Sequence, residues 1–303
     1  MSIAELESHE VELEVTGGGL WGEAFSRLRR NPGAIVGFVF VLVFVFVGIF
    51  APWIAPHGPL DQNLSIVSNG CCPGPSLDHW FGVDDLGRDE FSRVLYGARS
   101  SLVIGVVAVA VGLSFGLIVG AIAGYLGGFV DTLIMRGIDI MLAIPGLLFA
   151  IGIVAMLGPG LWQLMIAVGV VNVPVFARLL RGSILALREN DFVLAARSVG
   201  VPRRTILASH ILPNAISPVI VQGTLTLATA IIDVAGLSFL GLGQQDPSRP
   251  EWGAMLTGAN NYLQNAPFLA IIPGLAIVFS ALGFNLIGDG LREALDPKLR
   301  GRV

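Results

Sequence analysis

The chain of 303 residues is far more apolar than a soluble domain, with 54% hydrophobic residues, 13% charged residues and a mean hydropathy of +0.77. Soluble domains carry about 25% charged residues, so this composition excludes an ordinary soluble domain, gives no sign of nucleic-acid binding and predicts a protein that spans a bilayer. The formal net charge of −4 adds little, because the distribution of cations between loops sets membrane orientation.

The first 32 residues predict an acidic tail that leads into the first membrane segment. Five glutamates precede residue 20, and no cationic region stands before the first apolar run. A cleaved signal peptide normally begins with such a region. We therefore expect a mostly disordered tail followed by an uncleaved anchor.

Six stretches are apolar and long enough to cross a bilayer, since a spanning helix needs roughly 20 residues. Gly158-Pro159-Gly160 divides the longest uncharged stretch, so we assign two helices there. Prolines at 145, 174, 218 and 273 should kink their helices. The predicted spans are residues 34–55, 101–125, 133–157, 162–187, 211–235 and 267–289.

The cations predict the orientation of these six spans. With the N-terminus inside, 14 arginine and lysine residues fall at cytoplasmic positions or helix ends and four face outward. Cytoplasmic loops are rich in cations. Both termini are therefore expected in the cytoplasm, as in a multi-pass protein of a bacterial inner membrane.

Two adjacent cysteines, Cys71 and Cys72, lie in the loop that this topology places outside, where oxidation is permitted. A metal site at the cysteines would need further ligands, and only His57 and His79 are nearby. A vicinal disulfide or a bridge to a partner is a further alternative. Two ordinary loop cysteines remain the favoured interpretation, and no metal site is expected.

The cytoplasmic loop between the fourth and fifth spans carries the most informative pattern, AARSVGVPRRTILASHILPN from Ala195 to Asn214. Ala195 and Ala196 are small enough for another backbone to approach closely. Gly200 can adopt the left-handed conformation that ends a helix and turns the chain. We expect a short helix near residues 194–203 and a helix restart at His210.

This pattern resembles the docking loop of ATP-binding-cassette importer permeases, in which a short helix fits a groove on the ATPase. Further blocks resemble the C-type permeases of the dipeptide and oligopeptide importers, a group that includes nickel and glutathione permeases. The resemblance covers most of the chain after Asn31. It is carried by residues 81–100, 127–131, 136–145, 237–243, 250–253 and 284–299.

The resemblance implies an all-α integral membrane protein with six transmembrane helices and the type I ABC importer permease fold. The resemblance divides the chain into four segments: residues 1–32, the cytoplasmic tail; residues 33–100, the first helix and outer loop; residues 101–290, the permease core; and residues 291–303, a cytoplasmic tail. The ATPase-docking residues it implies are Ala195, Ala196, Gly200, Val201, Pro202, Arg203 and Arg204. Many such permeases have glutamate where this chain has Leu194.

Polar residues inside the spans are candidates for the translocation path, because they are costly in hydrocarbon. Asp233 could meet a peptide's amino terminus or could instead hydrogen-bond the glycine-rich exit that begins at Gly236. The candidates are Asn172, Gln222, Thr226, Asp233 and Asn285.

The chain has no GxxxxGK[ST] phosphate loop, and Lys298 is its single lysine. No catalytic arrangement is evident, so we expect a transport subunit that carries no cofactor, with ATP and magnesium on partner chains.

The resemblance implies uptake of short peptides, with nickel complexes, glutathione or another small solute as alternatives. The implied partners are a second, B-type permease, two ATP-binding subunits, an extracytoplasmic substrate-binding protein and membrane lipid. A secondary transporter would show charged residues at mid-membrane, which are nearly absent here.

Overall fold

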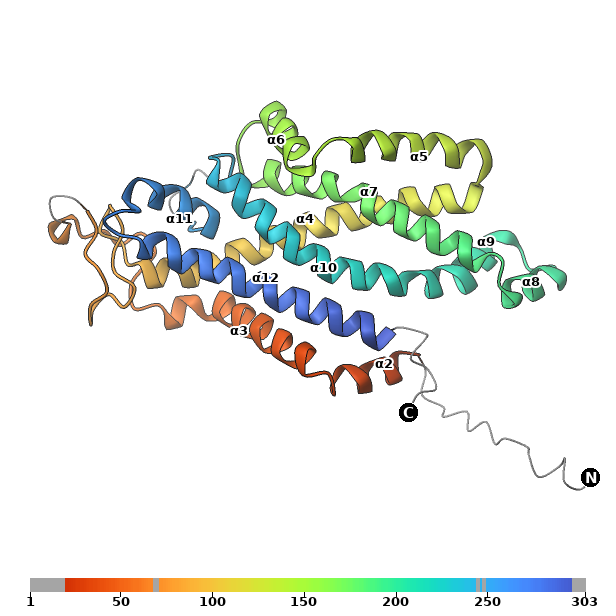
Figure 1. The fold of residues 1–303 in the computed structure, drawn as a ribbon, viewed down its shortest axis with the longest axis horizontal. Helices are drawn as coiled ribbons and strands as arrows, with labels where there is room; N and C mark the ends of the chain where they lie inside the picture. Colours follow the sequence, from red (N-terminus) through yellow and green to blue (C-terminus); the bar gives the residue numbers. More distant parts are fainter. Residues whose placement is uncertain (1–19, 68–70, 244–245, 247–248, 296–303) are drawn as a thin grey trace, which may run out of the picture.

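The computed structural model describes residues 20–67, 71–243, 246 and 249–295, and these fold into an elongated bundle of helices (Figure 1). Its helices are α2 (Leu20–Leu28), α3 (Pro32–Ile54), η2 (Leu64–Ile66), α4 (Glu90–Leu126), α5 (Gly128–Ala143), α6 (Gly146–Leu157), α7 (Leu161–Leu187), α8 (Asp191–Ser198), α9 (Arg203–Thr205), η3 (Ile206–Ile211), α10 (Leu212–Phe239), α11 (Trp252–Ala259), η4 (Asn260–Tyr262) and α12 (Phe268–Leu295). Among these residues the only β-structure is an isolated bridge between Val83 and Asp89. The acidic residues before Leu20 and the tail after Leu295 lie outside the described residues.

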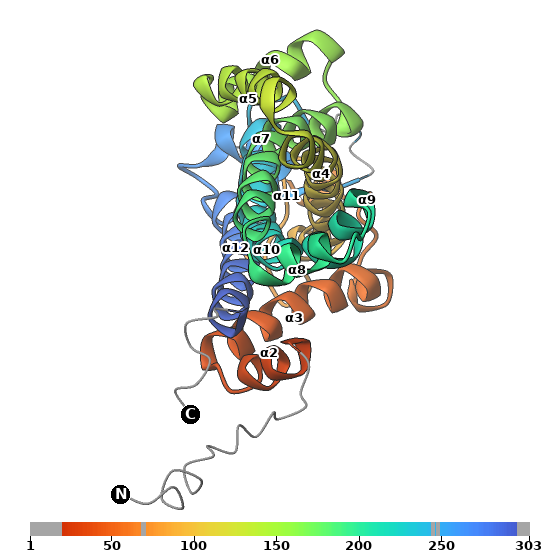
Figure 2. The same ribbon diagram turned by 90° about the vertical axis from the view of Figure 1, so that its right-hand side faces the viewer.

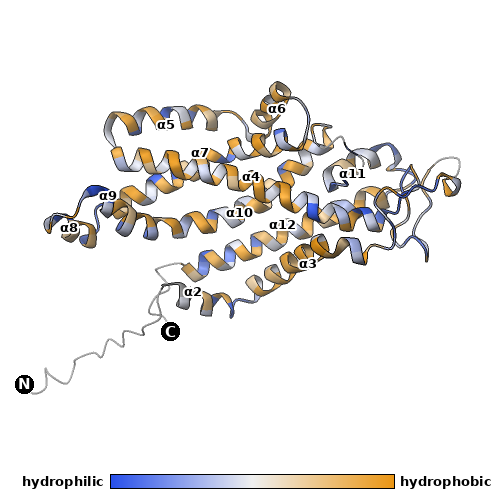
Figure 3. Cartoon of the chain, turned by 180° about the vertical axis from the view of Figure 1, so that it is seen from behind, coloured by the Kyte–Doolittle hydropathy of each residue, from blue (hydrophilic) through white to orange (hydrophobic). Residues whose placement is uncertain are grey.

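Five of the helices are long and apolar enough to cross a bilayer: α3, α4, α7, the continuous run from α9 to α10, and α12. They lie side by side along the length of the bundle, and Figure 3 shows apolar residues along each of them. A sixth crossing is possible only if α5 and α6 together form one broken span. Five of the predicted spans are therefore confirmed in position.

The predicted span over residues 133–157 is not one continuous helix. It is divided between α5 and α6, which meet at an angle of 95°. The break falls at Ile144 and Pro145. Ile144 is extended because a proline disfavours helical backbone in the residue before it, and Pro145 becomes the N-cap of α6. Pro174, Pro218 and Pro273, in contrast, lie inside α7, α10 and α12.

Helix α4 begins eleven residues before its predicted span, at Glu90 instead of residue 101. Its 37 residues correspond to about 55 Å, whereas the hydrocarbon core is about 30 Å thick. Its first turns therefore extend beyond the hydrocarbon core, next to the outer loop, residues 56–89. This loop and α11 occupy the end of the bundle opposite α2 and α8 (Figure 1).

A stripe of glycines joins α4 to α7. Gly112, Gly116 and Gly120 recur every four residues on α4 and are buried. A Cβ atom at Gly116 would lie 2.5 Å from Phe176 Cβ, and one at Gly120 would lie 2.5 Å from the carbonyl oxygen of Ala177. Small residues at this spacing allow membrane helices to approach closely. Side chains from both helices then fill the larger of the hydrophobic cores, together with α10.

A second core surrounds Trp252, whose side chain is fully buried between α4, α10 and α12. Its indole Nε1 donates to the carbonyl oxygen of Val94 at 3.0 Å, and its ring meets Phe44 of α3 edge-on. Asn31 ties α3 to α12 by capping α3 at Ala34 N and donating to Glu293. Helix α3 is thereby attached to the rest of the bundle.

Candidate functional site

The end of the bundle near α8 contains the predicted docking segment. Helix α8 spans Asp191–Ser198, so it begins and ends earlier than the expected helix near 194–203. The backbone N–H of Val201 donates to Ala196 O and that of Gly200 donates to Arg197 O, which is the hydrogen-bond pattern of a Schellman cap. Gly200 has a φ of +81°, which confirms its predicted left-handed conformation. The cap fixes the direction in which the chain leaves α8.

The two alanines of this segment lie on different faces of α8. Ala196 is 8% exposed and, with Val193, packs into the main hydrophobic core together with Ile206. Ala195 is exposed. Because one residue turns a helical side chain by about 100°, neighbouring alanines cannot share one contact surface. Ala196 therefore packs inside its own chain, and Ala195 is free to contact another protein.

An exposed apolar stripe on α8 accompanies Ala195. Phe192, Ala195 and Val199 follow one another at intervals of three and four residues and therefore share one side of the helix. Phe192 is 40% exposed and Val199 is 79% exposed. We call these three residues the α8 stripe. The i, i+3, i+7 spacing could have identified Phe192 and Val199 from the sequence, but the alanine pair drew attention away from them.

The helix that follows starts earlier than expected. It begins at Arg203, after Pro202 as N-cap, and passes through a π-helical segment, Ile206–Ile211, into α10. The restart predicted at His210 is therefore wrong, because His210 lies within a continuous helix. Arg203 and Arg204 are exposed, while Val201 is half-buried and packs against the main core.

A cavity beside α8 brings cationic side chains together. It is lined by Arg188 at the C-cap of α7, Arg197 of α8 and Arg203 of α9, along with Tyr125. Among them, Arg188 donates through Nη1 to the carbonyl oxygen of Gly124 at 3.2 Å. Figure 2, which views the bundle from this end, shows α8 and α9 nearest the viewer. The exposed apolar stripe is thus accompanied by a basic surface.

The translocation-path candidates are spread over three helices. On α10, Gln222 donates to the Thr226 hydroxyl at 3.2 Å, and Gln222 lines a groove between α7 and α10. Asn172 of α7 donates to the carbonyl oxygen of Val168 in its own helix. Asp233 is half-buried and Asn285 is exposed. Of the five, Gln222 and Thr226 are brought into contact, and Gln222 is the one that faces the groove.

Two ion pairs that the sequence did not predict join α5 to α7. Arg181 binds Asp131 through two hydrogen bonds, from Nε and from Nη2, and the Nη2 bond is 2.6 Å long. Arg178 Nη2 lies 2.6 Å from Asp139 Oδ1. The two hydrogen bonds of the Arg181–Asp131 pair fix the relative orientation of these side chains in addition to pairing their charges. These pairs therefore hold α5 beside the helix that leads to α8.

The opposite end of the bundle is organised around Asp84, in the outer loop. Its carboxylate accepts a hydrogen bond from Arg88 Nε at 2.6 Å, and Arg93 Nε lies 3.5 Å away. All three side chains are buried. Arg93 also donates to the carbonyl oxygen of Pro59. Residues 81–89 thus fold around a buried charge network.

Glu251, the N-cap of α11, should make the folding stability of this end of the bundle depend on pH. It is 1% exposed, accepts a hydrogen bond from Gly253 N at 3.2 Å, and burial raises its pKa. A raised folded-state pKa means that the folded chain holds the proton more tightly. This contribution to stability is complete below the ordinary carboxyl pKa and is lost as pH rises through the raised value.

We therefore expect Glu251→Gln, which keeps an oxygen acceptor without the charge, to lose less thermal stability than the wild type as the pH rises from 5 to 8.5. At the alkaline end the variant should melt at a higher temperature than the wild type. Thermal unfolding of both proteins in detergent across this range is the measurement. Parallel curves for the two proteins would contradict the assignment.

The bundle of bilayer-length helices, with a short capped helix at one end and a folded loop at the other, is the architecture of a multi-pass membrane protein. Residues 116–301 match the family described as binding-protein-dependent transport system inner membrane component, and residues 19–69 match the N-terminal transmembrane domain of oligopeptide transport permease C. The chain belongs to the binding-protein-dependent inner membrane component family. The expected fold class and the expectation of a transport subunit without enzyme activity are confirmed.

Its similarity to individual permeases extends over nearly the whole chain. It is 48% identical to the dipeptide transport system permease protein DppC of Alkalihalophilus pseudofirmus, over 92% of this chain and 90% of the relative. It is 52% identical to the glutathione transport system permease protein GsiD of Shigella flexneri, over 93% and 91%. The fold matches a chain of the inward-facing MetNI methionine ABC transporter with a TM-score of 0.55 and 18% identity, over 67% of this chain and 96% of that one.

Proposed function

We propose that the chain is one of two permease subunits of an ATP-driven importer of short peptides. The observation that carries the proposal is the α8 stripe, an apolar surface held rigidly by the Schellman cap at one end of the bundle. An ATPase that binds this stripe can push on α8 without bending it. The movement then passes through Val193 and Ala196 into the core that α8 shares with α7 and α10.

The sequence supports a division of labour between this chain and partner subunits. The chain lacks a phosphate loop, so two ATP-binding subunits supply the nucleotide and magnesium sites. A second permease completes the pore, and an external binding protein delivers the substrate to the outer loop. Both termini are assigned to the cytoplasm, because α2 and the last turns of α12 lie toward the same end of the bundle as α8 (Figure 1). Import is a shift of population between inward-open and outward-open pores, driven by the ATPases.

The substrate class is supported by the relatives, which are named for dipeptide and glutathione transport. Dipeptides and glutathione share peptide bonds and terminal charged groups, and the Gln222 side chain, which lines the groove, offers an amide to hydrogen-bond such a ligand. Short peptides are therefore the proposed cargo. Glutathione is the second candidate, and nickel complexes are the third.

Transport in proteoliposomes tests this proposal. The assembled transporter should accumulate labelled dipeptide only when ATP is on one side and the loaded binding protein is on the other. Protease added on the binding-protein side should cut within residues 56–89. The chain alone should hydrolyse no ATP above background. Parallel assays with labelled glutathione and a nickel complex identify the cargo, and uptake driven by an ion gradient without ATP would refute the mechanism.

A further inference from the structure

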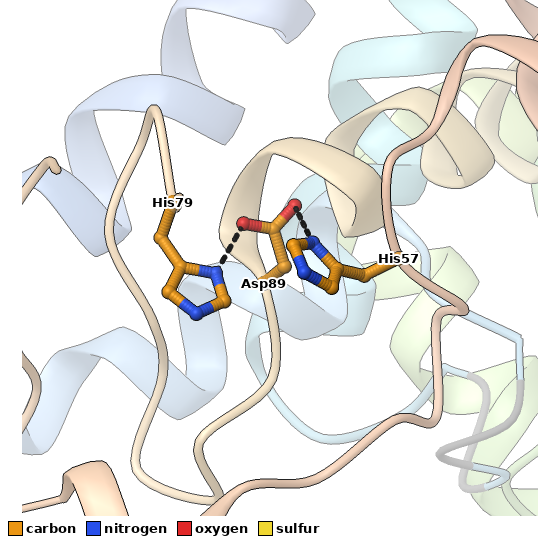
Figure 4. Close-up of side chains that lie close together, drawn as sticks. All are labelled: His57, His79 and Asp89. Atoms are coloured by element: carbon orange, nitrogen blue, oxygen red, sulfur yellow. Dashed lines mark hydrogen bonds and ion pairs between the residues drawn. The ribbon is translucent and has the colours of Figure 1, made fainter. Parts of the chain in front are cut away.

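Two histidines and a carboxylate meet at the outer end of the bundle (Figure 4). His57 follows α3, His79 lies in the outer loop, and Asp89 is the N-cap of α4. One candidate ligand atom from each residue lies within 4.8 Å of those of the other two. The cluster therefore joins three separate segments of the chain.

The carboxylate of Asp89 is held firmly in place. It is 1% exposed, and its Oδ2 accepts hydrogen bonds from Ser92 N at 2.8 Å and Ser92 Oγ at 2.7 Å. Its Oδ1 lies 2.9 Å from His79 Nδ1. The backbone of His79 is also fixed, because its N–H donates to Ser76 Oγ and its carbonyl oxygen accepts from Gly82 N.

His57 is held through its backbone, whose N–H donates to Ser92 Oγ at 3.2 Å. Its Nδ1 is buried and has no hydrogen bond, and it lies 3.8 Å from Asp89 Oδ2, beyond hydrogen-bonding distance. Its ring is 4.8 Å from that of His79, and the two are inclined by only 30°. Two imidazoles that converge on one carboxylate, with a buried nitrogen unpaired, form a donor set of the kind that binds a metal ion.

We propose that His57, His79 and Asp89 bind a zinc ion. Zinc bonds of about 2.1 Å to nitrogen and oxygen in tetrahedral geometry place ligand atoms roughly 3.4 Å apart. The two distances from the carboxylate, 2.9 and 3.8 Å, lie on either side of that value. Imidazole with carboxylate suits zinc, whereas calcium and magnesium prefer all-oxygen ligands. Water completes the coordination.

The ion has a structural consequence for the outer loop. It links the residues after α3 directly to the first turn of α4, where Ser92 orients the ligating carboxylate. The cysteines take no part, because Cys71 and Cys72 are joined as a vicinal disulfide and Cys72 packs beside the start of α12. The favoured expectation of two ordinary loop cysteines is therefore wrong in this structure, which has the vicinal disulfide that was the alternative.

Metal analysis of the full-length chain in lipid nanodiscs tests the site, using an affinity tag without histidines. After exposure to ZnCl₂ and dialysis against metal-free buffer, the wild type should retain about one zinc per chain, as expected for a single tightly bound ion. His57→Ala and His79→Ala should bind zinc at least about 100-fold more weakly. The matched control His210→Ala, at a histidine of η3, should keep the zinc.

Two further measurements keep the test decisive if the alanine variants fail to fold. Asp89→Asn retains an N-cap acceptor and should lose the ion while the chain remains folded. X-ray absorption at the zinc edge of the wild type should show scattering from two imidazoles. Wild-type protein without retained zinc, zinc without imidazole scattering, or equal loss in His210→Ala would overturn the proposal, whatever the transport assays show.

Discussion

Gly120→Leu is expected to lower the thermal stability of the chain more than any single replacement on the bundle's surface. Gly120 faces α7, and a Cβ atom there would lie 2.5 Å from the Ala177 carbonyl oxygen and 3.0 Å from Ala177 Cα. Both are backbone atoms, so they cannot rotate away as a side chain would. Overpacking of a well-filled core costs about 1–3 kcal/mol, and contact with rigid backbone places this site at or above that range.

Gly137→Leu is the matched control, because Gly137 also lies inside a helix but has no atom within 4 Å of an added Cβ. Thermal unfolding in detergent and the yield of monodisperse chain are the measurements. Gly120→Ala should fall between the wild type and Gly120→Leu, since even one carbon meets the carbonyl. Equal melting temperatures for the two leucine variants would show that α4 and α7 do not approach so closely.

Hydropathy predicted the number and position of most spans because bilayer thickness alone sets the required length. It could not predict the direction of the chain within an apolar stretch. Pro145 predicted a kink, but residues 140–157 are uncharged on both sides of it, and the turn between α5 and α6 depends on the extended backbone of Ile144. The glycine repeat at 112, 116 and 120 was readable in the sequence and would have predicted the contact of α4 with a neighbouring helix, although not that the neighbour is α7.

The residue types located the docking segment, but they did not predict which of its residues face outward. A leading alanine pair and a glycine predict a short helix with a left-handed end, which Gly200 confirms. Whether Ala195 or Ala196 faces outward depends on packing against Ile206, a residue that the sequence assigned to a loop. The two outer histidines are 22 residues apart, and only the folding of the outer loop onto α4 shows that both face Asp89.

Ala195→Glu is expected to abolish ATP-driven uptake while leaving the permease folded. Ala195 is exposed between Phe192 and Val199 of the α8 stripe, so a glutamate there meets only solvent in the isolated chain. Bound to an ATPase, it would be a buried charge without a partner, which costs about 3–5 kcal/mol. Affinity for the ATPases should therefore fall at least about 100-fold, since each 1.4 kcal/mol is tenfold. Pull-down of the ATPases and peptide uptake in proteoliposomes measure the loss.

Two neighbouring variants isolate the contribution of this face. Leu194→Glu adds the same side chain one residue earlier, about 100° around the helix, at a side chain that is 44% exposed. It should keep most of the uptake, because it restores the glutamate that related docking loops carry. Ala196→Glu would place the charge in the chain's own core and should lower its melting temperature, so it cannot report on docking. If Ala195→Glu retains its ATPases and transports at the wild-type rate, the α8 stripe is not the docking surface.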